Sequence, residues 1–316
     1  MRNFSLRKLS FASALLGVMA QQTPSTLAAG AQKPCEVSIT PSQFQSWMKQ
    51  YVPKGSNGRA PAAAFLEVES DGTVAREVYG LNEHKAQAVA STQKIITAYA
   101  AYRNEGLASN VTWNDQDRFY DSQGSTAVVY STKKNPSVGL STRAHEYLWT
   151  LMSHSSNGAA LALSRSIDSG STKAFVESMN DLSYELIGKE TASFDTYFHN
   201  PAGLTDNDDQ YEFGNPNEKQ RSTADNMARL TARIVGDSGF RSMMKRYGLA
   251  NFQGGIVTKG GSTQAAGKTL IAFIPLPKCK SKALSYAVFG EGTSAQWQNI
   301  GRMHTQILKA LGYSVK

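Results

Sequence analysis

The sequence predicts a mixed fold of the α/β (α+β) class: an antiparallel sheet with flanking helices, joined to an all-α lobe. Strand-like runs lie toward both ends of the chain and helix-like runs fill its middle. The two kinds of run do not alternate as they would in a doubly wound parallel sheet. The chain has 316 residues, 41% of them hydrophobic, which is enough for a sizeable core and excludes a disordered chain.

The elements expected near the N-terminus are a helix, a hairpin and a second helix. Residues 41–52 carry apolar side chains at helical spacing. Two β-rich runs, 62–68 and 74–79, flank an Asp-Gly turn at 71–72, which predicts a β-hairpin. Residues 91–104 have an apolar stripe at helical spacing and predict a helix.

Helices are also expected through the middle of the chain and strands toward its end. The helical segments are 142–152, 159–167, 172–186 and 223–235. The later strands are 255–259, 269–275 and 283–289, and the last helix is 294–311, with its apolar residues, Trp297 included, expected in the core. Both ends of the chain therefore contribute strands to one sheet.

Residues 1–31 are interpreted as a secretory signal peptide. Positive charges near the start precede the short apolar run FASALLGVMA and an Ala-Gly-Ala site at 29–31. A site after Ala20 competes for cleavage, and an uncleaved anchor remains an alternative. We expect secretion to a periplasmic or extracytoplasmic location. No later run is long enough to span a bilayer.

Residues 32–316 are expected to form a single catalytic domain with two lobes. The α/β lobe takes about 35–95 and 245–316, and the helical lobe about 96–244. The net charge is +8, and +5 remains without the three positive charges of the signal segment. This mild bias suits an acidic polymer or simply solubility, and it gives no clustered patch for nucleic acid.

The chain has two cysteines, which excludes a disulfide-dense scaffold and a four-cysteine zinc site. In an exported chain Cys35 and Cys279 can pair, although the sequence does not show whether they lie close enough. The five histidines are scattered and form no metal motif. We therefore expect no metal and no organic cofactor.

A serine and a lysine at helical spacing are the first sign of catalysis. Ser91 and Lys94 lie three residues apart at the start of a predicted helix, so their side chains share one face. A serine hydroxyl becomes a good nucleophile when a neighbouring base takes its proton. Lysine can be that base if burial and nearby positive charge lower its pKa. Alone, this spacing is common by chance.

Two further motifs follow in order and make the pattern specific. Ser155 and Asn157 form S-x-N in a loop that enters an Ala-rich helix, and Lys259-Gly260-Gly261 lies on a predicted strand. S-x-x-K, S-x-N and K-x-G, in this order, are the motifs of the penicillin-recognising serine enzymes. The chain resembles the D-alanyl-D-alanine carboxypeptidase family (peptidase S11-like), the low-molecular-mass penicillin-binding proteins with their related endopeptidases.

The resemblance runs from about residue 61 to the C-terminus. The further matching segments are SSNGAA at 155–160, FVESMN at 175–180, DTYFHNPAGL at 195–204, STAD at 222–225 and AG at 266–267. The resemblance implies a β-lactamase/penicillin-binding-protein-like fold with the site between its two lobes. It also implies peptidoglycan D-Ala-D-Ala stem peptides as substrates and β-lactams as covalent inhibitors.

The resemblance assigns a role to each motif residue. Ser91 is the acylated nucleophile, Lys94 accepts its proton, Ser155 passes a proton to the leaving amine, and Asn157 holds Lys94 and the substrate. The strand Lys259, Gly260, Gly261 and Ser262 binds substrate, with Lys259 keeping the site positive. The backbone N–H groups of Ser91 and Ser262 are the expected oxyanion hole.

The motif strand departs from the family pattern at one position. The family has threonine after the strand lysine, where its hydroxyl contacts the substrate carboxylate, and this chain has Gly260. Losing a charge-assisted hydrogen bond costs about 1.5–3 kcal/mol. Ser262 lies two residues further along, on the same face of the strand, and is a candidate to supply a hydroxyl instead.

Three functions from different classes remain open on the sequence. A peptidoglycan DD-peptidase, either carboxypeptidase or endopeptidase, is the leading interpretation. A serine β-lactamase is disfavoured because no E-x-x-L-N loop follows the second motif. A catalytically impaired cell-wall-binding homologue is the third interpretation, and it rests on Gly260, which stands where the family has threonine. Because Lys316 directly follows the last helix, we expect a short form like the soluble endopeptidases or a minimal carboxypeptidase.

Overall fold

The fold is taken from a computed structural model of the chain. It describes residues 35–52, 60–104, 106–122, 131–132, 134–167, 170–191, 193–204, 213–214, 218–249, 252–263, 265–290 and 294–315. The chain divides into two units, Met1–Pro34 and Cys35–Lys316. The segment interpreted as a signal peptide, 1–31, lies outside the described residues. Within them, no helix is both long and apolar enough to cross a membrane.

Six strands of the described chain form one antiparallel sheet in the order β2-β1-β8-β7-β6-β5. They are β1 (Ala62–Glu69), β2 (Val74–Leu81), β5 (Phe252–Gln253), β6 (Ile256–Thr263), β7 (Gly267–Leu276) and β8 (Cys279–Phe289). The N-terminal hairpin joins the sheet through β1, which pairs with the C-terminal β8 along its whole length. The prediction of a sheet completed by both ends of the chain is confirmed.

Helices from both ends of the chain cover one face of the sheet. They are α1 (Pro41–Tyr51) and α9 (Ser294–Ala310). A capping box at Thr40 begins α1, and Pro41 fits its first turn because the proline nitrogen has no hydrogen to leave unpaired. Phe44 and Met48, four residues apart, bury the same face of α1. They share one core cluster with Ile300, Met303 and Ile307 of α9.

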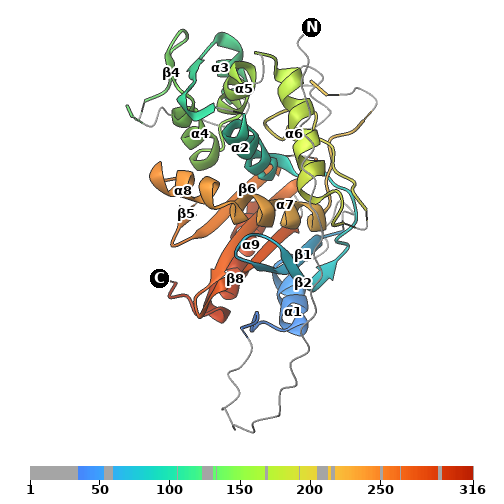
Figure 1. Cartoon of the computed structure of the whole chain (residues 1–316). Helices are drawn as coiled ribbons and strands as arrows, with labels where there is room; N and C mark the ends of the chain where they lie inside the picture. Colours follow the sequence, from blue (N-terminus) through green and yellow to red (C-terminus); the bar gives the residue numbers. More distant parts are fainter. Residues whose placement is uncertain are drawn as a thin grey trace, which may run out of the picture. The chain divides into compact units, whose positions relative to one another are not determined.

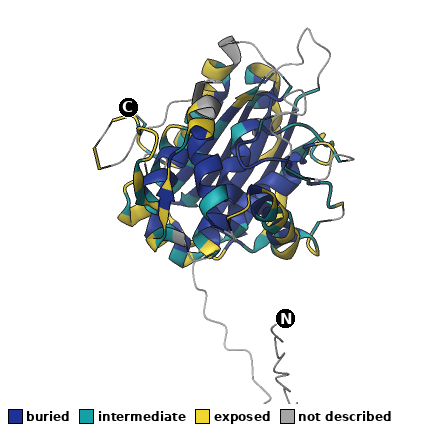
Figure 2. Cartoon of the chain, turned by 90° about the horizontal axis from the view of Figure 1, so that it is seen from above, coloured by how far each residue is buried: buried dark blue, intermediate teal, exposed yellow. Residues whose placement is uncertain are grey.

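The other face of the sheet is covered by α7 (Ala224–Gly236). The remaining helices of the middle of the chain gather at one end of the sheet (Figure 1). This helical part contains α2 (Lys94–Arg103), α3 (Asp115–Ser122), α4 (Ala144–Ser153), α5 (Asn157–Ser166) and α6 (Thr172–Ile187), with the short strands β3 (Asn110–Thr112) and β4 (Ser141–Arg143). The helix α8 (Ser238–Arg246) follows α7. The first eight residues of α2 are all buried, including the polar side chains of Lys94 and Thr97. Figure 2 shows buried residues through the sheet and the helices beside it.

The expected helices and long strands are present, with shifted ends. The predicted helix at 91–104 begins as a short 3₁₀ helix, η1 (Ala90–Gln93), that leads into α2; a second, η2 (Gly106–Ala108), follows α2. The strand predicted at 255–259 extends to Thr263. The sequence did not predict α3, α8, β3, β4 or β5. The lobe boundaries stay a prediction, although α7 lies against β1 and β8.

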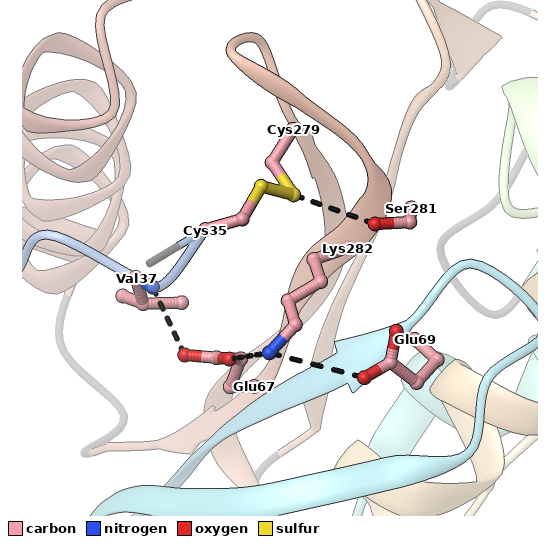
Figure 3. Close-up of a disulfide and its surroundings, with 7 residues drawn as sticks. All are labelled: Cys35, Val37, Glu67, Glu69, Cys279, Ser281 and Lys282. Carbon is pink, nitrogen blue, oxygen red and sulfur yellow. Dashed lines mark hydrogen bonds and ion pairs between the residues drawn. A yellow bond between two sulfur atoms is a disulfide. The ribbon is translucent and has the colours of Figure 1, made fainter. Parts of the chain in front are cut away.

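The first described segment is joined to the start of β8 by a disulfide. Cys35 and Cys279 are bonded, with their Cα atoms 5.8 Å apart (Figure 3). Beside the bridge, the Glu67 carboxylate is buried and accepts a hydrogen bond from the Val37 N–H (2.9 Å). Burial opposes ionisation of Glu67, but bonds from Lys282, Val37 and Arg76 outweigh it and lower its pKa.

Candidate active site

The nucleophile candidate sits on the 3₁₀ helix that precedes α2. Ala90 has φ 50°, a left-handed conformation that side chains other than glycine rarely adopt. This turn places Ser91 half-buried at the surface while Lys94, three residues on, is fully buried. The Lys94 Nζ lies 2.8 Å from the Ser91 Oγ. The i, i+3 spacing read from the sequence therefore brings the two groups into contact.

Two further acceptors surround the Lys94 amine. Its Nζ lies 2.6 Å from Asn157 Oδ1 and 2.7 Å from the backbone oxygen of Ala202. Asn157 is the first residue of α5, and the Ser156 side chain caps that helix by accepting from the Ala159 N–H. Three acceptors thus hold a buried nitrogen, which fixes its position as well as its hydrogen bonds.

The carbonyl of Ala202 is presented by a loop that one side chain organises. Asn200 Oδ1 accepts the backbone N–H groups of Ala202 (3.0 Å), Gly203 (2.9 Å) and Leu204 (3.1 Å). Gly203 has φ +81°, and a Cβ there would clash with the backbone oxygen of Ala90. The loop can therefore reach the turn before Ser91 only with glycine at this position.

The second lysine approaches from β6. Lys259 is buried, and its Nζ donates to Ser155 Oγ (2.8 Å) and to the Gly260 carbonyl (2.7 Å). Burial lowers the pKa of Lys259 to about 7 because the charged ammonium loses its hydration. Ser155 has φ 57°, so its backbone is held in a strained conformation in the loop before α5.

β6 passes close to the nucleophile through Gly261. A Cβ on Gly261 would lie 2.7 Å from the backbone nitrogen of Ser91 and 2.8 Å from that of Thr92. No side chain fits between the strand and the turn, which is why glycine is needed here. The structure thus joins Ser91, Lys94 and Asn157 in one group of hydrogen bonds and Lys259 and Ser155 in a second. β6, which carries Lys259, passes close to the Ser91 turn at Gly261.

Gly260 and Ser262 lie on the opposite face of β6 from Lys259 and Gly261, as strand alternation requires. A Cβ on Gly260 would overlap the indole ring of Trp297 in α9. The prediction that Trp297 belongs to the core is wrong, because its side chain is 36% exposed and lies over Gly260 instead. Ser262 is exposed, and its Oγ accepts from Lys268 Nζ at 2.6 Å.

Some of these contacts were not identified from the sequence. The Ala202 carbonyl is a backbone group, so the residue type at 202 could not predict its contact with Lys94. The segment NPAGL had marked only the loop as family-like. Lys268 follows the family-like pair Ala266-Gly267 but belongs to none of the three motifs, and Trp297 was expected in the core. Among the residues that the structure describes, no three side chains of His, Cys, Asp or Glu gather as a metal site would need.

The chain was compared with known families and proteins. A family model described as D-alanyl-D-alanine carboxypeptidase matches residues 59–275. No curated protein sequence matches the chain.

Solved structures similar to this chain share its fold. A mutant of the Streptomyces K15 DD-transpeptidase is 19% identical, with a TM-score of 0.58, and the match covers 79% of this chain and 97% of that one. A D-alanyl-D-alanine carboxypeptidase from Mycobacterium tuberculosis is 20% identical, with a TM-score of 0.56 and 85% and 96% covered. Penicillin binding protein 6B from Escherichia coli is 22% identical, with a TM-score of 0.56 and 81% and 80% covered. The predicted fold class is confirmed.

Proposed function

The chain belongs to the D-alanyl-D-alanine carboxypeptidase family of serine hydrolases, and from this we propose that it cleaves the D-Ala-D-Ala ends of peptidoglycan stem peptides through an acyl-enzyme on Ser91. The observation that carries the proposal is the contact of Lys94 Nζ with Ser91 Oγ at 2.8 Å. Such a contact lets a buried amine act as base toward a half-buried hydroxyl.

The partners of Lys94 suit a base. In the neutral amine, two N–H bonds can donate to Asn157 Oδ1 and the Ala202 carbonyl. The nitrogen lone pair is then left facing the Ser91 hydroxyl and can accept its proton. Ser91 Oγ forms a bond to the carbonyl carbon of the substrate, the carbonyl π pair moves onto oxygen, and Lys94 becomes an ammonium.

The proton then has to reach the leaving amine. Ser155 Oγ accepts a hydrogen bond from Lys259, which leaves its own hydrogen available to the leaving nitrogen. As the carbon–nitrogen bond breaks, Ser155 gives its proton to that nitrogen and regains one from the Lys259 ammonium, which becomes a neutral amine. Water releases the acyl group by the reverse sequence, in which Ser91 Oγ is the leaving group.

We propose the backbone N–H groups of Ser91 and Ser262 as the oxyanion hole, supported by the close approach of β6 to the Ser91 turn at Gly261. Removing one such donor typically costs about 3 kcal/mol of activation free energy. We also propose that the chain acts outside the cytoplasm once residues 1–31 are removed, because they have the composition of a secretory signal.

The test is intact mass after incubation of residues 32–316 with benzylpenicillin, comparing wild type with Ser91→Ala. We expect one stable adduct of the drug on the wild type and none on the variant, which should melt at the same temperature. Rapid release of hydrolysed drug would instead indicate a β-lactamase. No adduct at millimolar drug would overturn the peptidase proposal and favour a binding role.

A further inference from the structure

The position after the motif lysine has no room for a side chain. The Trp297 ring occupies the space into which a Cβ of Gly260 would project. A threonine hydroxyl therefore cannot contact a substrate carboxylate from position 260 unless Trp297 moves. A partner for such a carboxylate would then have to come from another residue on this face of the sheet.

A lysine on the neighbouring strand reaches the same face. Lys268 of β7 is paired directly with Ser262 of β6, so their side chains project on the side where Gly260 and Trp297 meet. The Lys268 Nζ donates to Ser262 Oγ at 2.6 Å and lies 5.7 Å from the centre of the Trp297 ring. The ammonium is thus held by a hydroxyl and by the face of an aromatic ring.

The position of Lys268 is open to a ligand. Both it and Ser262 have solvent exposure, and among the described residues no carboxylate forms an ion pair with Lys268. Within the described chain, β5 pairs only with Ile256 and Val257, so the edge of β6 beside Gly260 and Ser262 is left uncovered by it. A lysine ammonium held beside an uncovered strand edge can form an ion pair with the C-terminal carboxylate of a peptide bound there.

We infer that Lys268, positioned by Ser262 and Trp297, binds the terminal carboxylate of the substrate in place of the threonine hydroxyl missing at position 260. This inference rests on the proposed DD-peptidase function. An ammonium–carboxylate contact replaces a hydroxyl–carboxylate one, so recognition here depends on charge more than on a neutral hydrogen bond.

The experiment compares benzylpenicillin with its methyl ester, in which the carboxylate is masked. The rate of adduct formation on Ser91 is measured by mass spectrometry for the wild type, Lys268→Met and Lys268→Arg. We expect the wild type to prefer the acid and Lys268→Met to lose about 10- to 150-fold of that preference, the range of one charge-assisted hydrogen bond. Lys268→Arg keeps the charge and should retain most of the preference.

The matched control is Lys280→Met, an exposed lysine at the far end of the β7–β8 ladder, which should keep the wild-type ratio. An unchanged ratio in Lys268→Met would overturn the inference while leaving the DD-peptidase proposal intact. Equal loss in both lysine variants would overturn it too, because it would report net charge alone. A wild type that forms no adduct with either compound would remove the proposed function and the inference with it.

Discussion

At the scale of single residues, the two lysines of the site have different environments. Lys94 has three acceptors around one nitrogen, whereas Lys259 donates to one hydroxyl and one carbonyl. Because burial lowers the pKa of Lys259 to about 7, the unfolded chain binds more protons between about pH 7 and the ordinary lysine pKa of 10.5. The contribution of Lys259 to the free energy of unfolding therefore rises with pH across that window.

Catalysis should follow the opposite trend with pH. If the site must be positive to attract an anionic substrate, acylation by benzylpenicillin falls as Lys259 loses its proton, by about tenfold per pH unit well above its pKa. We expect a falling limb with an apparent pKa near 7 in the wild type. Lys259→Met should have a low rate without this limb. A wild-type rate that is flat up to pH 9 would contradict this role for Lys259.

At the scale of elements, the site depends on how closely a loop and a strand approach the Ser91 turn. The loop at 200–204 is held by Asn200 from within and by Thr97 of α2, whose hydroxyl donates to the Pro201 carbonyl at 2.7 Å. The Gln93 side chain also donates to the Asn200 carbonyl. The loop is therefore fixed to the same short segment that carries the nucleophile.

A methyl group added at Gly203 should destabilise the protein by more than the strain of its left-handed backbone alone. Gly203→Ala combines a left-handed φ with a clash against Ala90. Gly312→Ala is the matched control, because Gly312 has φ +94° and nothing within 4 Å of the added carbon. Strain of this kind costs about 1–3 kcal/mol.

We expect Gly312→Ala to lose that amount of stability in urea unfolding and Gly203→Ala to lose more, because of its clash with Ala90. Only Gly203→Ala should lose at least tenfold in the rate of acylation. Equal acylation rates for the two variants would show that the loop does not set the position of the Ser91 turn.

The sequence predicted elements well where periodicity was long and poorly where it was short. The segment 172–186 had enough residues to show a helical period, and 283–289 is a nearly continuous apolar run; both elements are present. The strands β3 and β4 have three residues each and pair mainly through tertiary context, so no pattern marked them. Trp297 was misplaced because helical spacing shows which residues share a face and not which neighbour that face meets.

At the scale of the whole molecule, the N-terminal segment is attached to the sheet at two points. The disulfide joins Cys35 to Cys279, 244 residues away. The buried carboxylate of Glu67, in β1, accepts a hydrogen bond from the Val37 N–H. Lys282 of β8 binds the same carboxylate (Figure 3). Arg76 of β2 binds it as well, so one side chain links three strands and the segment. A bond that closes so long a loop restricts the unfolded chain strongly.

Removing the disulfide should destabilise the fold without changing its core. We expect Cys35→Ser with Cys279→Ser to lower the free energy of unfolding by about 2–5 kcal/mol in urea at pH 7. Wild type kept reduced with dithiothreitol should unfold at the same urea concentration as the double variant. Identical midpoints for oxidised wild type and double variant would contradict a stabilising role for the bond.

The strand order also determines when the sheet can assemble as the chain is synthesised. β8 is the last of the described strands to be synthesised, yet it lies between β1 and β7 in the middle of the sheet. Until residues 279–289 emerge, the β1–β2 hairpin has an unpaired inner edge, and Cys35 has no partner sulfur. A chain cut short before β8 leaves two separate pieces of sheet with exposed edges, a recognised route to aggregation. The appearance of β8 is therefore the step that joins the two parts of the sheet.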